Sequence, residues 1–247
     1  LSSLDGVPIS WKDLFDIAGF PCEAGSELLA GRVANQNSEV YSIAEAHGLI
    51  CLGKTHMSEL AFSGLGLNPI RETPPCFNYP GSVPGGSSSG AATSVAFGLA
   101  AAGIGSDTGG SVRIPAAWND LVGFKTTAGR LSLKGVVPLC SRFDTVGPLV
   151  KSVEDAARLF GLMAGGEIRL PTPLSVKGLT FGILKNVAMD NIMDLPKKAF
   201  NDSIDKLKTA GAIVSEISVP SVDEAMDLTG LLYSPEAYAT WKDKIEK

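Results

Sequence analysis

The chain has 247 residues, of which 45% are apolar and 19% are charged, and its net charge is −5 at pH 7. This composition supports a large hydrophobic core in one or two domains. No lysine- and arginine-rich run and no bilayer-length apolar run occurs, so we expect neither a nucleic-acid nor a membrane partner. The cysteines form no C-x-x-C pair, and we therefore expect a reduced, cytoplasmic protein.

The first two thirds of the chain, residues 5–165, alternate short apolar runs with helix-like stretches. This alternation is typical of an α/β protein. The apolar runs predict strands at 49–52 and 101–105. The helical spacing of apolar residues predicts helices at 40–47, 91–99 and 153–163.

A second β-α-β unit is predicted after residue 174. Residues 178–184 read as a strand, 197–209 have apolar residues at helical spacing, and 212–219 alternate like a strand. We expect this unit to pack on the same sheet as residues 1–165. The chain starts without methionine and ends in a helical pattern over 234–247 without a terminating glycine or proline, so we expect a fragment of a longer polypeptide.

Two glycine- and serine-rich segments, 84–90 and 105–117, flank the predicted helix at 91–99. Either segment alone is explained as a flexible loop or a helix cap. In the second segment, Gly109 and Gly110 permit backbone angles that let consecutive N–H groups converge on one point beside Ser111, as in an oxyanion hole. Asp107 and Arg113 are spaced to pair across this loop, although an exposed pair would contribute little stability.

Three other motifs in the sequence match catalytic or nucleotide-binding patterns only formally. Residues 48–55 fit the phosphate-binding P-loop, but 49–52 read as a strand rather than a glycine-rich turn. Ser88 is central in a G-x-S-x-G pattern, yet the histidine that an α/β-hydrolase needs does not follow it. The S-x-x-K pattern at 203–206 lies in a charged amphipathic stretch.

The two histidines, His47 and His56, are interpreted as structural hydrogen-bonding residues. No metal-ligand spacing occurs in the sequence, so we expect neither a metal nor another cofactor.

Several segments in the same order resemble the amidase signature family over about residues 4–165. The two glycine-serine segments resemble the signature itself, and Asp5-Gly6-Val7-Pro8-Ile9-Ser10-Trp11-Lys12-Asp13 resembles the lysine motif of that family. Residues 53–59 and 143–148 look like further family segments. The resemblance implies a mixed central β-sheet covered by helices on both faces, incomplete at its C-terminal side. It also implies one domain over 1–247, with the motifs in 1–165 and the β-α-β segment in 174–247.

The resemblance also implies a role for each motif residue. Ser111 would attack the carbonyl carbon, Ser87, which follows a cis peptide bond in the family, would bridge Ser111 to Lys12, and Lys12 would accept the proton. Backbone N–H groups of Thr108, Gly109 and Gly110 would hold the oxyanion, supported by Ser88, Asp107 and Arg113. A lysine acts as a base only when it is neutral, so Lys12 must be buried where its pKa falls.

The resulting prediction is an amidase that hydrolyses a small carboxamide through a serine acyl-enzyme, with a homodimer as a candidate assembly. One alternative is the A subunit of the tRNA-dependent amidotransferase, which releases ammonia from glutamine. That subunit usually has glutamine three residues after the nucleophile, where this chain has Ile114, which suggests an uncharged or apolar substrate group nearby. A second alternative is an inactive or truncated amidase-like chain. The loop at 64–66 is a candidate entrance to the site.

Overall fold

The computed structural model describes residues 2–165, 170 and 172–246. The chain divides into two compact units: unit 1 comprises Leu1–Pro171 and Glu236–Lys247, and unit 2 comprises Thr172–Pro235. Each unit is described below by itself. The expected single domain over 1–247 stays a prediction.

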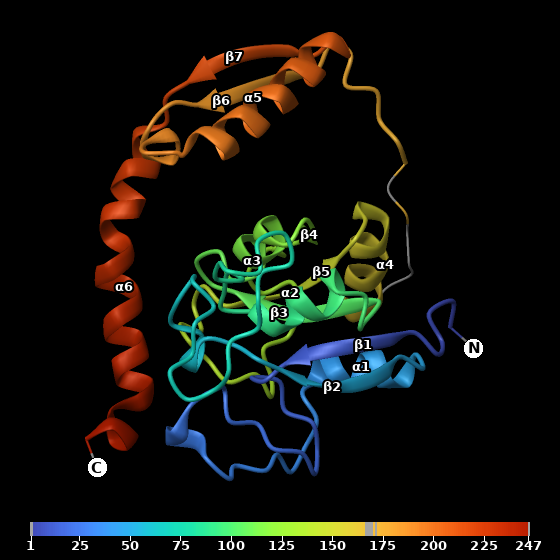
Figure 1. Ribbon diagram of the computed structural model, residues 1–247, viewed down its shortest axis with the longest axis vertical. Helices are drawn as coiled ribbons and strands as arrows, with labels where there is room; N and C mark the ends of the chain where they lie inside the picture. The colour runs from blue at the N-terminus through green and yellow to red at the C-terminus, as the bar shows by residue number, and fades with distance from the viewer. Residues whose placement is uncertain (1, 166–169, 171, 247) are drawn as a thin grey trace. The chain divides into compact units, whose positions relative to one another are not determined.

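Unit 1 contains a five-stranded mixed sheet in the order β2-β1-β3-β5-β4 (Figure 1). Strand β1 pairs in parallel with both β2 and β3, whereas β5 runs antiparallel to β3 and β4. The predicted mixed central sheet is therefore confirmed. The strands are β1 (Pro8–Lys12), β2 (Ile50–Thr55), β3 (Ala102–Asp107), β4 (Val122–Gly123) and β5 (Thr145–Val150).

Helices cover both faces of this sheet. Adjacent residues of β1 point in opposite directions and therefore contact different helices. Trp11 packs edge-on against Tyr41 of one helix, with ring centroids 5.1 Å apart, while the Ser10 hydroxyl lies 2.8 Å from the Ser94 hydroxyl of another. The helices of unit 1 before its C-terminal segment are α1 (Glu39–Ala46), α2 (Ser89–Ala96), α3 (Arg113–Trp118) and α4 (Val153–Met163), with short 3-10 turns at Glu27–Leu29 and Glu59–Ala61.

Helix α2 packs against β3 (Figure 1), and β3 has glycine at two of the contact positions. A Cβ atom at Gly103 would lie 2.5 Å from the Ala91 carbonyl oxygen, and one at Gly105 would lie 2.6 Å from the Ser88 hydroxyl. Real Cβ contacts are longer, so these two glycines set the depth of α2 and of the loop that precedes it. A buried cluster of Ala91, Ala92, Val112, Ala116 and Leu149 joins α2, the start of α3 and β5.

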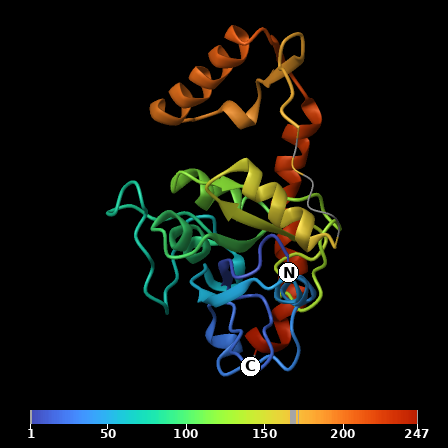
Figure 2. The same ribbon diagram turned by 90° about the vertical axis from the view of Figure 1, so that its right-hand side faces the viewer.

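Unit 2 contains β6 (Thr180–Leu184), a 3-10 turn at Val187–Met189, α5 (Asp194–Thr209) and β7 (Ile213–Ile217). The predicted β-α-β order is present, and in both views α5 runs alongside the two strands (Figure 1, Figure 2). However, β6 and β7 pair in parallel with each other in a separate two-stranded sheet, from Thr180 opposite Ile213 to Leu184 opposite Ile217. The expectation that this unit packs on the first sheet stays a prediction.

The helix expected at 234–247 is longer than predicted. Helix α6 (Pro220–Ile245) begins in unit 2 and ends in unit 1, and Pro235 lies inside it. Across the described residues, no helix is both long enough and apolar enough to cross a membrane. The cytoplasmic location and the homodimer stay predictions.

Candidate active site

Lys12 ends strand β1 and is fully buried, with an exposed fraction of 0%. Its Nζ atom donates hydrogen bonds to Ser87 Oγ at 2.7 Å and to Ser106 Oγ at 2.8 Å. Strand β1 lies between β2 and β3, and Lys12 pairs with Thr55 of β2. The lysine motif and the first glycine-serine segment are thus brought into direct contact.

Burial lowers the pKa of Lys12 from 10.5 to about 7, because the charged ammonium loses its hydration inside the protein. The negative charges of Asp107 and Asp144 act in the opposite direction and raise this pKa in part. Near neutral pH a substantial fraction of Lys12 is therefore an uncharged amine, which is the form that can accept a proton.

Ser87 is buried in the loop before α2, and the Gly86–Ser87 peptide bond is cis. The loop at 64–66 lies directly against it: Gly86 N donates to the Gly64 carbonyl oxygen at 2.8 Å, and a Cβ atom at Gly86 would lie 2.5 Å from Gly66 N. Ser58 N donates to the Ser87 carbonyl oxygen at 3.2 Å. Residues 64–66, suggested from the sequence as an entrance, therefore border the Ser87 loop.

Ser111 lies in the loop between β3 and α3 and is 8% exposed. Its carbonyl oxygen accepts a hydrogen bond from Ser88 N at 3.2 Å, which joins the two glycine-serine segments through their backbones. Within the described residues, no hydrogen bond links Ser111 Oγ to Ser87 Oγ. The structure therefore contains the Lys12–Ser87 contact of the expected relay and holds Ser111 nearby through the backbone.

Asp107, at the end of β3, organises the Ser111 loop. Its buried carboxylate accepts from the backbone N–H groups of Gly110, Val112 and Arg113 at 2.8, 3.1 and 3.3 Å, and from Arg113 Nε and an Arg113 Nη at 3.0 and 2.9 Å. Burial alone would raise the pKa of Asp107, but the Arg113 guanidinium and these N–H donors hold it below its ordinary value.

The expected Asp107–Arg113 pair is present, and only its arginine is exposed. The Asp107 side chain is 0% exposed, while that of Arg113 is 52% exposed. The sequence separation of six residues indicates the pairing but not that the carboxylate is inside the fold. Because this buried carboxylate gathers five N–H donors, it fixes the shape of the whole loop.

The three residues expected to form an oxyanion hole have different surroundings. Gly109 is exposed, whereas the Gly110 N–H donates to Asp107 Oδ1 and so points into the loop. The Thr108 hydroxyl donates to Asp144 Oδ1 at 2.5 Å. Gly110 has φ +135°, where glycine is favoured, and a Cβ atom there would lie 2.6 Å from Ile114 Cδ1.

Sequence reasoning missed two residues at the site, Ser106 and Asp144. Ser106 contacts Lys12 as described, and the Asp144 carboxylate accepts from Thr108 Oγ1, Leu139 N and Cys140 N. Both residues lie inside segments that carried the resemblance, so the segments could have drawn attention to them. Nothing in residue type or spacing distinguishes them from neighbouring serines and acids.

The amidase family profile matches residues 1–247. The chain belongs to the amidase family. A similar curated relative is 2-amino-5-chloromuconic acid deaminase of Comamonas testosteroni, 38% identical over 232 residues that cover 92% of this chain and 50% of that protein. The A subunit of glutamyl-tRNA(Gln) amidotransferase from Campylobacter curvus is 38% identical over 227 residues, which cover 84% of this chain and 48% of that relative.

Solved structures of the amidase family are also similar to this chain. A crystal structure of an amidase aligns with a TM-score of 0.90 at 33% identity, covering 99% of this chain and 55% of that one. Native peptide amidase from Stenotrophomonas maltophilia aligns with a TM-score of 0.81 at 27% identity, covering 98% and 55%. This amidase chain spans about half the length of the curated relatives that it matches.

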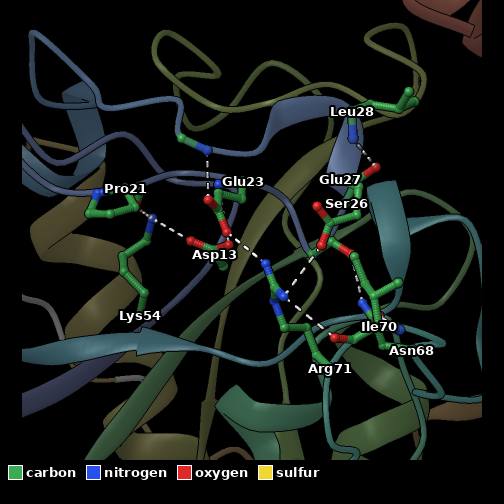
Figure 3. A network of polar contacts seen from close by, with 12 residues as sticks. Asp13, Pro21, Glu23, Ser26, Glu27, Leu28, Lys54, Asn68, Ile70 and Arg71 are labelled. Atoms are coloured by element: carbon green, nitrogen blue, oxygen red, sulfur yellow. Dashed lines mark hydrogen bonds and ion pairs between the residues drawn. The ribbon is translucent and has the colours of Figure 1, made fainter.

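Residues 48–55, which fit the P-loop pattern, contain a strand, as their apolar residues indicate. Most of them form β2, and the Nζ of Lys54 donates to Asp13 Oδ1 at 3.0 Å (Figure 3). Figure 3 also shows Arg71 between Glu23 and Glu27, in the same network as Asp13. This network fixes the chain on the C-terminal side of Lys12, since Asp13 also accepts from Glu23 N.

Both histidines make hydrogen bonds to neighbouring groups of the protein. His47 Nδ1 lies 2.8 Å from the Ile43 carbonyl oxygen, and His56 Nδ1 lies 2.7 Å from Ser89 Oγ. Burial lowers the pKa of His56. Across the part of the chain that the structure describes, no group of three His, Cys, Asp or Glu side chains is arranged to hold a metal ion.

Proposed function

We propose that this protein cleaves the C–N bond of a small carboxamide, with Ser111 as nucleophile, Ser87 as proton relay and Lys12 as base. One observation carries the proposal: a fully buried lysine, with a pKa lowered to about 7, contacts the hydroxyl of Ser87. A neutral buried amine beside a serine is able to remove a proton from it. The main-chain hydrogen bond from Ser88 N to the Ser111 carbonyl oxygen supports the placement of the proposed nucleophile near Lys12 and Ser87.

Proton transfer in the proposed reaction runs through two hydroxyl groups. The Lys12 lone pair accepts the Ser87 proton while Ser87 Oγ accepts the Ser111 proton, and Ser111 Oγ bonds to the carbonyl carbon. When the C–N bond breaks, the proton returns from Lys12 through Ser87 to the leaving nitrogen, and an ester remains on Ser111. Water then attacks the ester by the same relay, which releases the acid and restores Ser111.

The negative oxygen of the intermediate requires N–H donors in the Ser111 loop. The Gly110 N–H is held by Asp107, so we assign this role to the N–H groups of Gly109 and Ser111, with Thr108 fixed behind them by Asp144. Ile114, half-buried beside Gly110, and the exposed Leu65 give this side an apolar character. They favour a substrate whose acyl group is uncharged there.

A second candidate function is release of ammonia from glutamine, as in an amidotransferase of the same family. Its support is the 38% identity to the Campylobacter curvus relative. A glutaminase assay distinguishes the two, because a general carboxamide hydrolase with Ile114 at this position is expected to prefer uncharged primary amides to glutamine.

The test of the proposed function uses a fluorophosphonate, a probe that phosphonylates activated serines. Peptide mapping is expected to find the label on Ser111, and Ser111→Ala is expected to lose it. Ser10→Ala, which removes a buried serine hydroxyl bonded to Ser94 in the same unit, is the matched control and keeps the label. Label on another serine, or label retained by Ser111→Ala, contradicts the assignment.

A further inference from the structure

Ser106 is the second partner of the buried lysine, and the proposed relay gives it no task. Its Oγ accepts from Lys12 Nζ at 2.8 Å, nearly the same distance as the 2.7 Å to Ser87 Oγ. Ser106 is 5% exposed and lies in β3, with β1 on one side and β5 on the other. Its carbonyl oxygen accepts from Ser88 Oγ at 3.2 Å. The strand and this hydrogen bond therefore hold the Ser106 backbone in place beside Lys12.

The contact between Lys12 and Ser106 matters because it affects which way the lone pair of a neutral amine points. Neutral Lys12 has two N–H donors and one lone pair, and only the lone pair can take the proton of Ser87. If an N–H points at Ser87 instead, Lys12 is a donor to that serine and cannot act as its base. An acceptor elsewhere that holds one N–H leaves the lone pair free to face Ser87.

We propose that Ser106 is a positioning residue for Lys12: its hydroxyl oxygen accepts one amine hydrogen and thereby turns the lone pair toward Ser87. This inference rests on the proposed function, because it matters only if Lys12 is the base. The charged groups that act on Lys12 are Asp107 and Asp144, and a substitution at Ser106 removes neither carboxylate.

The same contact affects the two charge states of Lys12 differently. A hydrogen bond from a charged ammonium is stronger than one from a neutral amine, so Ser106 favours the charged form. Removal of the hydroxyl should then lower the pKa of Lys12 further and also let the neutral amine rotate. The first effect moves the pH midpoint of activity downward, and the second lowers the maximal rate.

The experiment measures the rate constant of Ser111 labelling by the fluorophosphonate from about pH 5 to about pH 10, since such a profile reports the base of the free enzyme. Ser106→Ala is compared with Ser106→Thr, which keeps a hydroxyl, and with the Ser10→Ala control. Thermal unfolding of each variant is followed in parallel. We expect Ser106→Ala to lower the plateau by about 10- to 100-fold, which is part of the roughly 10²- to 10⁴-fold that general acid–base catalysis typically contributes.

Three further results decide the inference. The midpoint of Ser106→Ala should lie below that of the unaltered protein, Ser106→Thr should recover most of the plateau, and Ser10→Ala should leave the profile unchanged. An unchanged midpoint in Ser106→Ala overturns the proposal, whether or not the plateau falls, because a merely structural role lowers the rate without moving the pKa. Label that persists in Ser111→Ala points instead to failure of the proposed function.

Discussion

Replacement of Lys12 by methionine should make the protein inactive and should favour the folded state more at neutral or lower pH than near pH 10. Methionine is a similarly long apolar side chain, so Lys12→Met removes the charge while largely filling the same buried volume. A fall in pKa from 10.5 to about 7 corresponds to about 5 kcal/mol disfavouring the charged form in the folded protein, because each tenfold change in proton affinity is about 1.4 kcal/mol.

The pH dependence follows from proton binding in the two states. Between about pH 7 and 10.5 the unfolded lysine is protonated and the folded one is largely neutral, so stability rises with pH in this window. Below about pH 7 both forms are protonated, and the full penalty of a buried charge remains. Lys12→Met has no such term, but it leaves Ser87 and Ser106 without the amine, at a cost of about 1–3 kcal/mol for each hydroxyl left unsatisfied.

The assay is urea unfolding at pH 6 and near pH 10, followed by tryptophan fluorescence, to which the buried Trp11 contributes. The free energy of unfolding of Lys12→Met minus that of the unaltered protein should fall by several kcal/mol, up to about 5 kcal/mol, from pH 6 to near pH 10. Lys151→Met, which replaces an exposed lysine, is the matched control. Its free energy of unfolding should differ from that of the unaltered protein by a similar amount at both pH values. A Lys12→Met difference that is constant with pH would refute the reasoning, since Lys12 would then be charged in the folded state.

Two further substitutions test the Ser111 loop. Asp107→Asn should destabilise the protein by about 3 kcal/mol and slow Ser111 labelling at least tenfold, because an amide cannot replace a buried carboxylate among five N–H donors. Thermal unfolding at pH 7 measures the stability, and the labelling rate measures the second effect. A loss of stability below about 1 kcal/mol contradicts the role of Asp107. Gly110→Ala should slow labelling strongly, since alanine is strained at φ +135° in the Ser111 loop and its Cβ would also displace Ile114 Cδ1, 2.6 Å away, whereas Gly129→Ala, at φ +75° with nothing within 4 Å, should leave the rate unchanged. Equal rates in the two glycine variants would contradict this account.

The elements predicted best from the sequence are those whose local signals agree with their packing. Helix α4 has the predicted bounds, because Ser152 caps its first turn by accepting from Asp155 N and its apolar residues lie on one face. Strand β5 was missed because Gly147 and Pro148 lie inside it, and both residues usually argue against a strand. The helix expected from residue 234 begins instead at Pro220, because Pro235 resembles a helix start in sequence but is internal here.

At the site, the resemblance paired residues that are far apart in sequence, and Lys12 and Ser87 are indeed in contact. Spacing could not reveal Ser106 as a second partner of Lys12, because that contact depends on how β1 and β3 lie side by side. It also could not reveal that Asp107 is buried. Burial is a property of the assembled sheet, and a short polar loop reads as exposed until its surroundings are known.

The hydrogen bond from Ser88 N to the Ser111 carbonyl oxygen has an evolutionary consequence. Because it joins two main-chain groups, the approach of the two loops does not depend on which side chains occupy the neighbouring positions. Substitutions at Leu65 or Ile114 are therefore expected to leave this main-chain contact in place. If the proposed function holds, changes of substrate choice through these two side chains are expected to be separable from changes in the proton relay.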